Sequence, residues 1–500
     1  MSPASFSNDF VQTALARPSA SILDFDLCGR ELSNEGCTRD SWSGQYLMPI
    51  EQTSLTRVAN AVGSAQEAYQ QGKWRGLSRY KRKGLLLQWA DLIELHANSL
   101  AYLNCLETGR SLKSLQRDSL PKALRVLRWF AELIDKLDDR SVHPGEFGND
   151  FAIVRREPIG VVAAILPWND PMVTFLWKAA PALAMGNAVI VKPSEHATLV
   201  ILEAVRLAHL AGIPSGVFQV ITGDGRVGQL LAQQPGIEKI AFTGSSETAM
   251  AIGIGALKTG LKRVSFECGG KSPFIFGRGG RDLKEFAAVV ARSMFYNQGQ
   301  ICSAPSIVHV PVARADEMID YVCEAAKDFL PSHPINGGEV GYMVSRQAVA
   351  KLRAALSTVD YSHFMGSVGE HKISSVDPDW SVTPTILAGI PDAHPFWDTE
   401  LFGPILLVRP YERVEQALAH AASSKYGLAA GVWSQDMDEA MEIAAQFQAG
   451  NVHINSWGDD PDQVPFGGVK QSGYGREKSV DTLDSYSQLK SVYFRPHKCP

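Results

Sequence analysis

The sequence predicts an α/β protein with two domains, each built around a parallel sheet. From residue 160 onward, short apolar runs alternate with helix-length segments, a pattern typical of βαβ units. The chain has 500 residues, more than one hydrophobic core usually organises. Apolar residues make up 45% and charged residues 20%, as in an ordinary globular protein.

The segment before these units is predicted to be largely helical. Residues 59–69, 80–95 and 123–137 carry apolar side chains at three- and four-residue spacing, which indicates amphipathic helices. A polar, turn-rich segment at 138–150 precedes a strand candidate at 151–156, and a last apolar strand lies at 491–494. Neither strand belongs to an obvious core, so both are candidates for bridging subunits.

Two α/β series follow in order along the chain. The first has predicted strands at 160–166, 188–191, 217–221, 239–242 and 263–266, with helices near 172–184, 198–211, 226–233 and 246–257. The second begins near 272, with strands at 273–276, 306–310, 405–408, 430–433 and 451–454, and a helix at 283–297. We interpret each series as one α/β domain.

Composition excludes several classes of protein. A net charge of -5 gives no electrostatic case for nucleic acid or an anionic membrane as partner. No apolar run is long enough to span a bilayer, and residues 1–20 lack the pattern of a secretory signal. Seven scattered cysteines without a CxxC pair favour a reducing cytoplasm and no metal site.

Two glycine-containing turns could bind a pyrophosphate. Residues 223–228 match GxGxxG between a strand and a helix, but so short a pattern fits a tight βα turn equally well. Gly244 and Ser245 open the helix near 246, where free backbone N–H groups suit a phosphate. The alternative for Ser245 is an ordinary helix N-cap.

A third strand end could bind a ribose. Lys192 and Glu195 follow the strand at 188–191, and ligands of open α/β sheets lie at the carboxyl ends of strands. A carboxylate there would accept both ribose hydroxyls and repel a 2′-phosphate, which favours NAD over NADP. Ser194 could instead be the N-cap of the helix that follows, and the two interpretations are compatible.

Three further residues suit catalysis. Glu267 lies between a strand end and two glycines, where it could act as a general base. Cys302 follows Gly299, which is placed to end a helix; it is a candidate nucleophile or a small buried hydrophobe. Asn169 follows the strand at 160–166, where its amide could donate to an oxyanion or simply form a turn.

Taken together, these segments resemble the aldehyde dehydrogenase superfamily over about residues 45–495. The motifs are ETG at 107–109, PWN at 167–169, KPSE at 192–195, FTGS at 242–245, ECGGK at 267–271, GQIC at 299–302, TELFGP at 399–404, YGLAA at 426–430 and PFGGVKQSGYGRE at 465–477. The resemblance implies a Rossmann-like NAD-binding domain (1–132 and 153–266), an α/β catalytic domain (267–479) and a small β oligomerisation element (133–152 and 480–500). It also implies a homodimer or homotetramer.

The resemblance implies a role for each matching residue. Cys302 would be the nucleophile, Glu267 the base for the deacylating water, and Asn169 with the backbone N–H of Cys302 the oxyanion hole. Lys178 and Glu477 would form a proton relay behind Glu267. The residues implied at the NAD site are Ile165, Trp168, Lys192, Glu195, Gly225, Gly228, Gly244, Ser245, Glu400 and Phe402. The reaction would be NAD-dependent oxidation through a thiohemiacetal and a thioester, with hydrolysis rather than transfer to coenzyme A.

The substrate channel is where the sequence departs from the family pattern. The closest likeness is to aminoaldehyde dehydrogenases, including γ-glutamyl-aminobutyraldehyde dehydrogenases. The implied channel residues are Asp170, Trp177, Trp457, Asp459 and Phe466, with Asp460 nearby. Aromatic faces and carboxylates suit a cationic ω-amino group, although the aromatic residues could be plain apolar wall and the aspartates solvated.

Three departures concern single positions. Asp170 stands where an apolar residue is common, and a buried carboxylate needs a partner. That partner is either a substrate ammonium or amide, or an arginine or lysine of the protein. Ala249 replaces a glycine of the cofactor helix, which would tighten the pocket or weaken cofactor affinity, and Ile307 stands where an arginine is frequent, with no assigned consequence.

Two rival functions remain open from the sequence. One is a cofactor-independent thiol esterase that uses Cys302 and Glu267, and the other is an idle homologue that only binds. The presence of Cys302, Glu267 and Asn169 together argues against the idle homologue.

Overall fold

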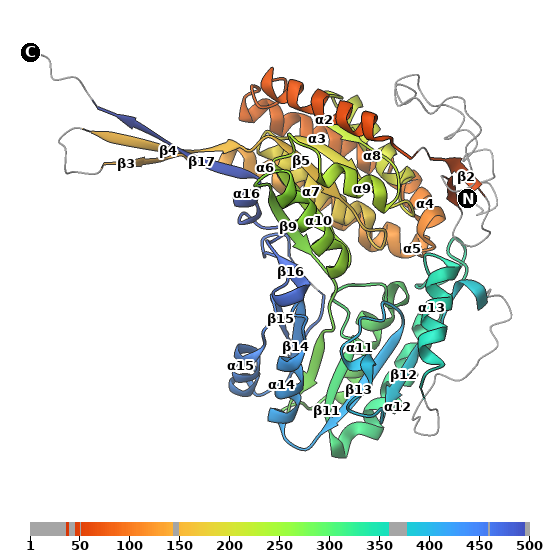
Figure 1. Cartoon of the computed structure of the whole chain (residues 1–500). Helices are drawn as coiled ribbons and strands as arrows, with labels where there is room; N and C mark the ends of the chain where they lie inside the picture. The colour runs from red at the N-terminus through yellow and green to blue at the C-terminus, as the bar shows by residue number, and fades with distance from the viewer. Residues whose placement is uncertain are drawn as a thin grey trace, which may run out of the picture.

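Two α/β bodies and a projecting arm make up the molecule in Figure 1. The computed structural model describes residues 37–39, 46–50, 52–143, 150–359, 378–458 and 461–495. Each body contains a six-stranded sheet, and the arm is a three-stranded sheet. Near the N-terminus, β1 (Cys37–Arg39) and β2 (Tyr46–Pro49) form a small antiparallel pair.

The first body holds a doubly wound sheet in the order β16-β9-β8-β5-β6-β7. Its strands are β5 (Val161–Ile165), β6 (Ala188–Lys192), β7 (Phe218–Val220), β8 (Lys239–Thr243), β9 (Arg263–Glu267) and β16 (Gly473–Tyr474). All neighbours are parallel except β16, which pairs antiparallel with β9. The chain builds outward from β5 to β7 and then returns to β8 on the other side of β5. The carboxyl ends of β5 and β8 therefore form a switch point, where open α/β sheets bind ligands.

Helices cover both faces of this sheet. The connecting helices are α7 (Pro171–Ala184), α8 (Leu199–Leu210), α9 (Gly225–Ala232) and α10 (Ser246–Lys258). An N-terminal group packs beside them: α2 (Leu55–Gln70), α3 (Arg79–Leu95), α4 (Ala97–Thr108), α5 (Leu112–Ser114) and α6 (Leu120–Leu133), with a five-residue π-helical turn at Leu115–Ser119. The strands and connecting helices predicted here agree with the structure to within one residue at each end. Helix α4 was not predicted, because it buries the polar side chains of Asn104, Glu107 and Thr108 and so lacks a simple apolar stripe.

The second body holds a parallel sheet in the order β12-β13-β11-β10-β14-β15. Its strands are β10 (Pro273–Phe276), β11 (Ile307–Pro311), β12 (Thr385–Ala388), β13 (Ile405–Tyr411), β14 (Ala429–Trp433) and β15 (Asn451–Ile454). Its helices are α11 (Leu283–Phe295), α12 (Ala315–Ala326), α13 (Arg346–Leu356), α14 (Val414–Ser423) and α15 (Met437–Gln446). The five predicted strands are present, whereas the short edge strand β12 was missed.

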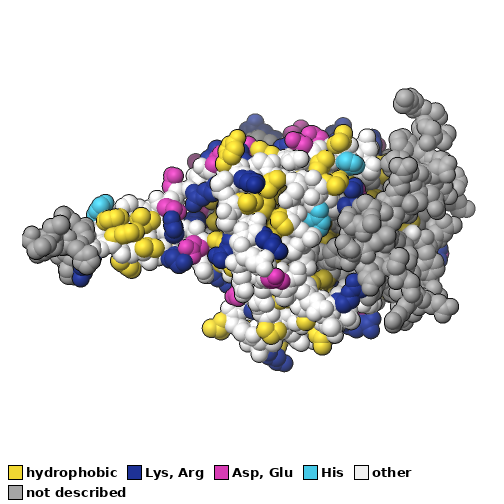
Figure 2. All heavy atoms as spheres, turned by 90° about the horizontal axis from the view of Figure 1, so that it is seen from above, with side chains coloured by type: hydrophobic (Ala, Val, Ile, Leu, Met, Phe, Trp, Pro, Cys, Tyr) yellow, Lys and Arg dark blue, Asp and Glu magenta, His cyan; other side chains and the backbone are white. Residues whose placement is uncertain are grey.

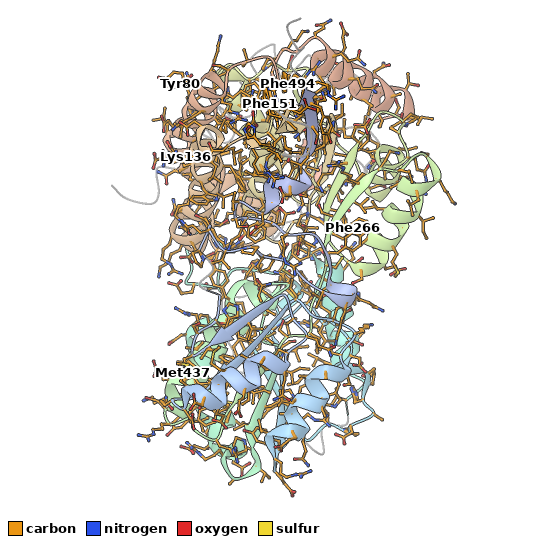
Figure 3. All side chains as sticks on the ribbon, turned by 90° about the vertical axis from the view of Figure 1, so that its left-hand side faces the viewer. Tyr80, Lys136, Phe151, Phe266, Met437 and Phe494 are labelled. Atoms are coloured by element: carbon orange, nitrogen blue, oxygen red, sulfur yellow. The ribbon has the colours of Figure 1, made fainter. Side chains whose placement is uncertain are left out.

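The arm joins segments that lie far apart in the sequence. Strand β4 (Phe151–Pro158) pairs antiparallel with β3 (Arg140–Val142) on one side and with β17 (Ser487–Phe494) on the other. The rings of Phe151 and Phe494 stack with centroids 4.6 Å apart near the end of the described arm (Figure 3). Strand β4 reaches Pro158, beyond the boundary expected at residue 152. The short helix α16 (Thr482–Ser485) leads into β17.

None of the helices within the described ranges is long and apolar enough to cross a membrane.

Candidate active site

A cavity of about 1380 Å³ lies where the two bodies meet. The loops that follow β5 and β8 line one side of it, and the loop that precedes β11 lines the other. The following predicted site residues line it: Trp168, Asn169, Asp170, Trp177, Gly244, Ser245, Glu267, Cys302, Glu400, Phe402, Trp457 and Phe466. Sequence segments more than a hundred residues apart therefore meet at one cavity.

Cys302 is presented by a loop with an unusual backbone. Helix α11 ends at Phe295, earlier than predicted, and Asn297 and Gln298 then adopt φ values of 50° and 54°. Such left-handed conformations are costly for residues other than glycine, so the surroundings must hold them. The buried Gln298 amide does this, donating to the Gly341 carbonyl at 2.9 Å and accepting from the backbone N–H of Val382 at 3.1 Å.

The Cys302 thiol is protonated at neutral pH in the resting site. Burial and, to a smaller extent, the carboxylates of Glu400 and Glu267 raise its pKa, the backbone N–H groups of Ser303 and Cys302 lower it, and the result is about 12. The side chain remains partly exposed to the cavity. Because only the thiolate is a strong nucleophile, this cysteine needs a base that removes its proton.

Glu267 has the properties of that base. It ends β9 and is only 3% exposed. Burial raises its pKa well above the usual value, and the nearby Glu477 raises it further, whereas Lys178 and Arg476 lower it. A carboxylate with a raised pKa is matched to proton transfer near neutral pH. A Cβ on Gly467 would lie 2.7 Å from Glu267 Oε1. Glycine at this position therefore leaves room for the carboxylate.

Asn169 points its amide at the cysteine loop. Its Nδ2 donates to the Gln300 carbonyl at 3.0 Å, and its own carbonyl accepts from Asn297 Nδ2 at 3.2 Å. The amide N–H is therefore held beside the segment that carries Cys302. A donor at this position suits an oxyanion that forms next to the sulfur.

Lys178 and Glu477 form a buried ion pair behind the cavity rather than in its wall. Their Nζ and Oε1 atoms are 2.6 Å apart, and the side chains are 0% and 2% exposed. Glu477 is fixed by backbone hydrogen bonds with Phe466 in both directions, at 2.7 and 2.8 Å. Both members of the pair affect the pKa of Glu267.

The predicted ribose site has the expected side chains at a strand end. Lys192 ends β6, and its Nζ lies 4.0 Å from Glu195 Oε2. Gly228 lies beside Lys192, since a Cβ on it would be 3.9 Å from Lys192 Cδ. A Cβ on Gly225 would meet nothing within 4 Å, which leaves open space next to these groups.

The two glycine turns differ in what they offer a phosphate. At α10, Ser245 is the N-cap, because its Oγ accepts from the backbone N–H of Thr248 at 3.2 Å. At α9, the Asp224 carboxylate accepts from the backbone N–H of Arg226 at 2.8 Å, so a protein carboxylate already occupies that helix end. Gly223 turns the chain tightly, since a Cβ there would meet Val227 at 2.4 Å.

Helix α8 is capped by Glu107, a residue of the ETG motif to which the sequence assigned no role. Its N-cap position is Thr198, not Ser194 as expected. The buried carboxylate of Glu107 accepts the backbone N–H groups of Thr198, Leu199 and Val200 at 2.7 to 3.0 Å. The ETG motif therefore contributes to α8 from a different helix.

Glu400 and Phe402 line the cavity near the glycines of the ECGGK segment. Glu400 Oε1 accepts from the backbone N–H of Gly270 at 3.0 Å, and burial raises the pKa of this carboxyl to about 7. Phe402 has a φ of 52°, and its ring meets that of Trp168 edge-on at 5.5 Å. Ile165 ends β5 as a buried residue and does not line the cavity.

Asp170 lines the cavity, but the protein itself supplies the partner for its charge. Its Oδ2 lies 3.0 Å from Nη1 of Arg110, and its Oδ1 accepts from the Ser119 hydroxyl at 2.5 Å. Arg110 is 2% exposed and also donates to the hydroxyl of Tyr296 at 2.6 Å. The argument that Asp170 needs a substrate ammonium as its partner therefore fails.

The aromatic side chains of the channel also make contacts with other groups of the protein. Trp177 packs on Phe466 with centroids 5.1 Å apart, and Lys122 Nζ lies 5.6 Å from the Trp177 ring centroid. Trp457 donates its Nε1–H to the Ser303 carbonyl at 3.1 Å. Asp459 and Asp460 lie outside the described residues.

Residue spacing alone could not reveal the group around Asp170. Arg110 follows directly after the ETG motif, while Ser119 lies in the π-helical turn, where an extra residue per turn changes which side chains face the cavity. In the sequence, the only indication of this group was the ETG motif that directly precedes Arg110.

The other departures from the family pattern are buried. Ala249 lies on α10 at 4% exposure, and Ile307 begins β11 at 3% exposure within an apolar cluster. An apolar residue at 307 thus fits its packed surroundings.

Fold and site together define a class: a dehydrogenase with a doubly wound sheet that faces a cavity lined by a cysteine and a buried carboxylate. The chain belongs to the aldehyde dehydrogenase family, whose sequence model matches residues 33–492. It is an NAD-dependent enzyme that oxidises aldehydes.

Several proteins of known sequence or structure are similar over nearly the whole chain. The NADP/NAD-dependent aldehyde dehydrogenase PuuC of Escherichia coli is 36% identical, covering 89% of this chain and 91% of that protein. The aminoacetaldehyde dehydrogenase of Pseudomonas aeruginosa is 35% identical and covers 90% of both chains. Among solved structures, the γ-glutamyl-γ-aminobutyraldehyde dehydrogenase of Burkholderia cenocepacia has a TM-score of 0.87 at 34% identity, covering 94% and 95% of the two chains. The indole-3-acetaldehyde dehydrogenase AldA of P. syringae, solved with NAD+ and IAA, has the same TM-score at 34% identity, covering 92% and 93%.

Proposed function

We propose that the enzyme converts an aldehyde to its carboxylic acid through a thioester on Cys302, which water then hydrolyses. The observation that carries this proposal is the meeting of Cys302, Glu267 and Asn169 at one cavity. These residues supply a nucleophile, a base and an oxyanion donor, which are the groups that acyl chemistry of this kind requires.

The first half of the reaction forms the thioester. Glu267 accepts the proton of the Cys302 thiol, and the sulfur bonds to the aldehyde carbon. The carbonyl oxygen becomes an oxyanion that Asn169 Nδ2 and the backbone N–H of Cys302 stabilise. Bound NAD would supply the two-electron acceptor for the hydride that leaves the aldehyde carbon, and the carbonyl would then reform as a thioester.

The second half releases the acid. Glu267 first passes on the thiol proton and returns to its carboxylate form. Water then attacks the thioester while Glu267 takes one of its protons, and the carbon–sulfur bond breaks to return Cys302 as its thiolate. The proton on Glu267 passes to Lys178 as Lys178 gives a proton to Glu477. The 2.6 Å contact between Lys178 and Glu477 supports this last transfer. We infer a non-acylating enzyme, since Glu267 favours water over coenzyme A as the acceptor.

We assign residues to the parts of NAD by the groups that each part needs. Lys192 and Glu195 would hold the adenosine ribose, and the α10 N-terminus at Gly244 and Ser245 would hold the pyrophosphate. The open surroundings of Gly225 and the Lys192–Glu195 spacing of 4.0 Å fit such a ligand. Gly228, Ile165 and Trp168 would border the cofactor, and Glu400 and Phe402 its nicotinamide.

For the substrate we propose an aldehyde that bears an amino or amide group. Two similar proteins are named for aminoacetaldehyde and for γ-glutamyl-γ-aminobutyraldehyde. The wall formed by Trp177, Trp457 and Phe466 would pack on the aliphatic part of such a substrate. Asp170 is not assigned to its amino group, because Arg110 neutralises that carboxylate.

A panel of aldehydes tests this function. The purified protein is incubated with NAD or NADP and amino-, amide-, aryl- and unsubstituted aldehydes of equal length, and formation of the reduced cofactor is followed. We expect activity with NAD and the highest kcat/KM for an amino or amide aldehyde. Ester cleavage that needs no NAD, without any reduced cofactor formed from any aldehyde, would instead support the esterase.

We also propose that the chain forms a homodimer or homotetramer in the cytoplasm. One face of α10 exposes Met250, Ile254 and Leu257, each more than half exposed, and Leu261 follows at 95%. Figure 2 shows hydrophobic side chains gathered on the projecting arm. Apolar surface of this kind marks contacts with another chain. The free cysteines Cys105, Cys268, Cys302 and Cys323 are in keeping with a reducing compartment.

The division into domains is a further proposal. The NAD-binding domain would comprise 1–132 and 153–266, the catalytic domain 267–479, and the oligomerisation element 133–152 and 480–500. The separate sheets support it, although β16 adds residues 473 and 474 to the first sheet.

A further inference from the structure

A buried lysine lies behind the Lys178–Glu477 pair and has no role in the reaction described so far. Lys239 begins β8 and is 1% exposed. Its Nζ donates to Ser265 Oγ at 2.9 Å and lies 4.9 Å from the ring centroid of Tyr486. No carboxylate of the described chain lies within ion-pair distance of it.

An ammonium group in such a place is costly unless a nearby charge offsets its lost hydration. Burial lowers the pKa of Lys239 to about 7, and the charge of Glu477 raises it. The interaction is mutual, because Lys239 lowers the pKa of Glu477 in addition to the effect of Lys178. Glu477 is therefore the carboxylate that stabilises this buried charge.

Three elements hold the lysine next to the relay. Ser265 lies on β9 and accepts the hydrogen bond of Lys239, and Glu267 ends the same strand. Gly475 packs directly on Ser265, since a Cβ on it would lie 2.8 Å from Ser265 Cβ. The segment that carries Glu477 is thus fixed against the same residue that orients Lys239.

Two buried oxygens of this group of residues have no partner among the described residues. Oε2 of Glu477 and the hydroxyl of Tyr486 are buried and make no hydrogen bond with any of the described residues. Buried polar atoms of this kind are normally satisfied by ordered water. Water there would connect Glu477 to the neighbourhood of Lys239 and Tyr486.

We propose that Lys239 is a positioning residue for deacylation, whose buried positive charge keeps Glu477 in the ionised form that accepts a proton from Lys178. The proton then leaves Glu477 through water in the polar space beside Tyr486, and Glu477 is returned to its carboxylate form. This inference rests on the proposed function of the Lys178–Glu477 relay.

The effect on pH dependence follows from the charges that face these groups. Glu477 faces Lys178, Lys239, Glu267 and Tyr486, and Lys239 faces Arg263 in addition. Removal of the charge at 239 raises the pKa of Glu477. The acidic limb of the kcat profile therefore moves to higher pH.

The test compares Lys239→Met with Lys262→Met. Lys262 is also buried, at 9% exposure, but its Nζ donates to the Ala232 carbonyl at 3.1 Å and its electrostatic partner is Glu238. In Lys239→Met we expect about a tenfold loss of kcat at pH 6.5, equivalent to one pKa unit, with recovery at higher pH. The first-turnover burst of NADH should remain, because thioester formation precedes this step. Lys262→Met should keep the wild-type pH profile.

Two further variants keep the test decisive. If Lys239→Met does not fold, Tyr486→Phe removes only the hydroxyl and should lower kcat about threefold, equivalent to about 0.65 kcal/mol, with the burst intact. Identical pH profiles for Lys239→Met and wild type, or unchanged kcat in Tyr486→Phe, would overturn the inference. Glu477→Gln distinguishes failure of the relay from failure of the role of Lys239. If deacylation is slow in Glu477→Gln but normal in Lys239→Met and Tyr486→Phe, the role of Lys239 is rejected. If deacylation is normal in Glu477→Gln, the relay itself is rejected.

Discussion

At the scale of single residues, the proposed reaction uses two ionisable groups whose pKa values are both raised. The Cys302 thiol has a pKa of about 12, and the Glu267 carboxyl has one well above its usual value. The pair resists ionisation in the resting site, and activity should rise with pH as Glu267 loses its proton. Each residue can be tested by its effect on a different half of the reaction.

Substitution of the nucleophile and of the base should give distinct kinetics. Cys302→Ala should abolish turnover and prevent alkylation at this position, because no thioester can form. Glu267→Gln should slow steady-state turnover by about 10²-fold or more, the usual contribution of a general base. Stopped-flow measurement should still show some NADH in the first turnover of Glu267→Gln. The burst should be slower than in wild type, because Glu267 also removes the thiol proton of Cys302. A burst of wild-type rate would show that another group deprotonates the cysteine.

The environment of Asp170 favours the second of the two partners that the sequence left open, an arginine of the protein rather than a substrate ammonium. Its carboxylate is bound by Arg110 and Ser119, and it adjoins Asn169 in the chain. Asp170→Asn should therefore lower kcat/KM for all aldehydes by a similar factor, about tenfold for the loss of one charge-assisted contact. The measurement is kcat/KM for matched amino and unsubstituted aldehydes. A selective loss for the amino aldehyde would restore the idea of direct recognition by Asp170.

At the scale of elements, helix α8 depends on a cap from α4. Glu107 accepts three backbone N–H groups of the α8 N-terminus. Glu107→Ala leaves these donors buried without an acceptor, and we expect a loss of about 2–5 kcal/mol in stability. Thermal unfolding measures it, with Glu203→Ala on the outer part of α8 as a control that should change little. A melting temperature like that of wild type would mean that the helix end is stabilised in another way.

The same cap should also depend on pH. Burial raises the pKa of Glu107 to about 7, although the three N–H groups lower it. A carboxyl with a raised folded-state pKa contributes its full stability below its unfolded value of 4.5 and loses it as pH rises through 7. Wild type should therefore lose stability relative to Glu107→Gln between pH 5 and pH 8, as melting curves at both pH values would show. A constant difference between the two proteins would contradict this sign.

At the scale of the whole molecule, the apolar stripe on α10 predicts association. Met250, Ile254 and Leu257 follow helical spacing on one face of α10, and Leu261 is exposed just after the helix ends. Burying several such side chains contributes about 25 cal/mol per Å². The double variant Ile254→Glu and Leu257→Glu should shift the protein to a smaller species in light scattering. The matched variant Met437→Glu and Met441→Glu changes exposed residues of α15 (Figure 3 labels Met437) and should leave the mass unchanged. An unchanged mass in the α10 variant would show that this face of α10 is not the interface between subunits.

The sequence predicted the regular elements well because each obeys a local rule. Buried strands such as β6 are continuous apolar runs, and α7 and α10 begin and end at the residues that their patterns indicate. Local patterns failed where a long-range partner decides the outcome. Ser194 is a good N-cap residue, yet Glu107, far away in the sequence, accepts the N–H groups of α8. Likewise, α11 ends before Gly299 because side chains of Gln298 and Gln300 anchor the loop to distant backbone.

The sequence by itself determined the fold class and the family, since ordered motifs fix which residues lie at the strand ends. The tertiary structure alone decided how the charges are paired. Only packing shows that Arg110 neutralises Asp170, or that Lys239 faces Glu477 at the back of the relay. The physical reason is that burial and charge pairing act through space over a few ångströms, whereas spacing along the chain records only local geometry.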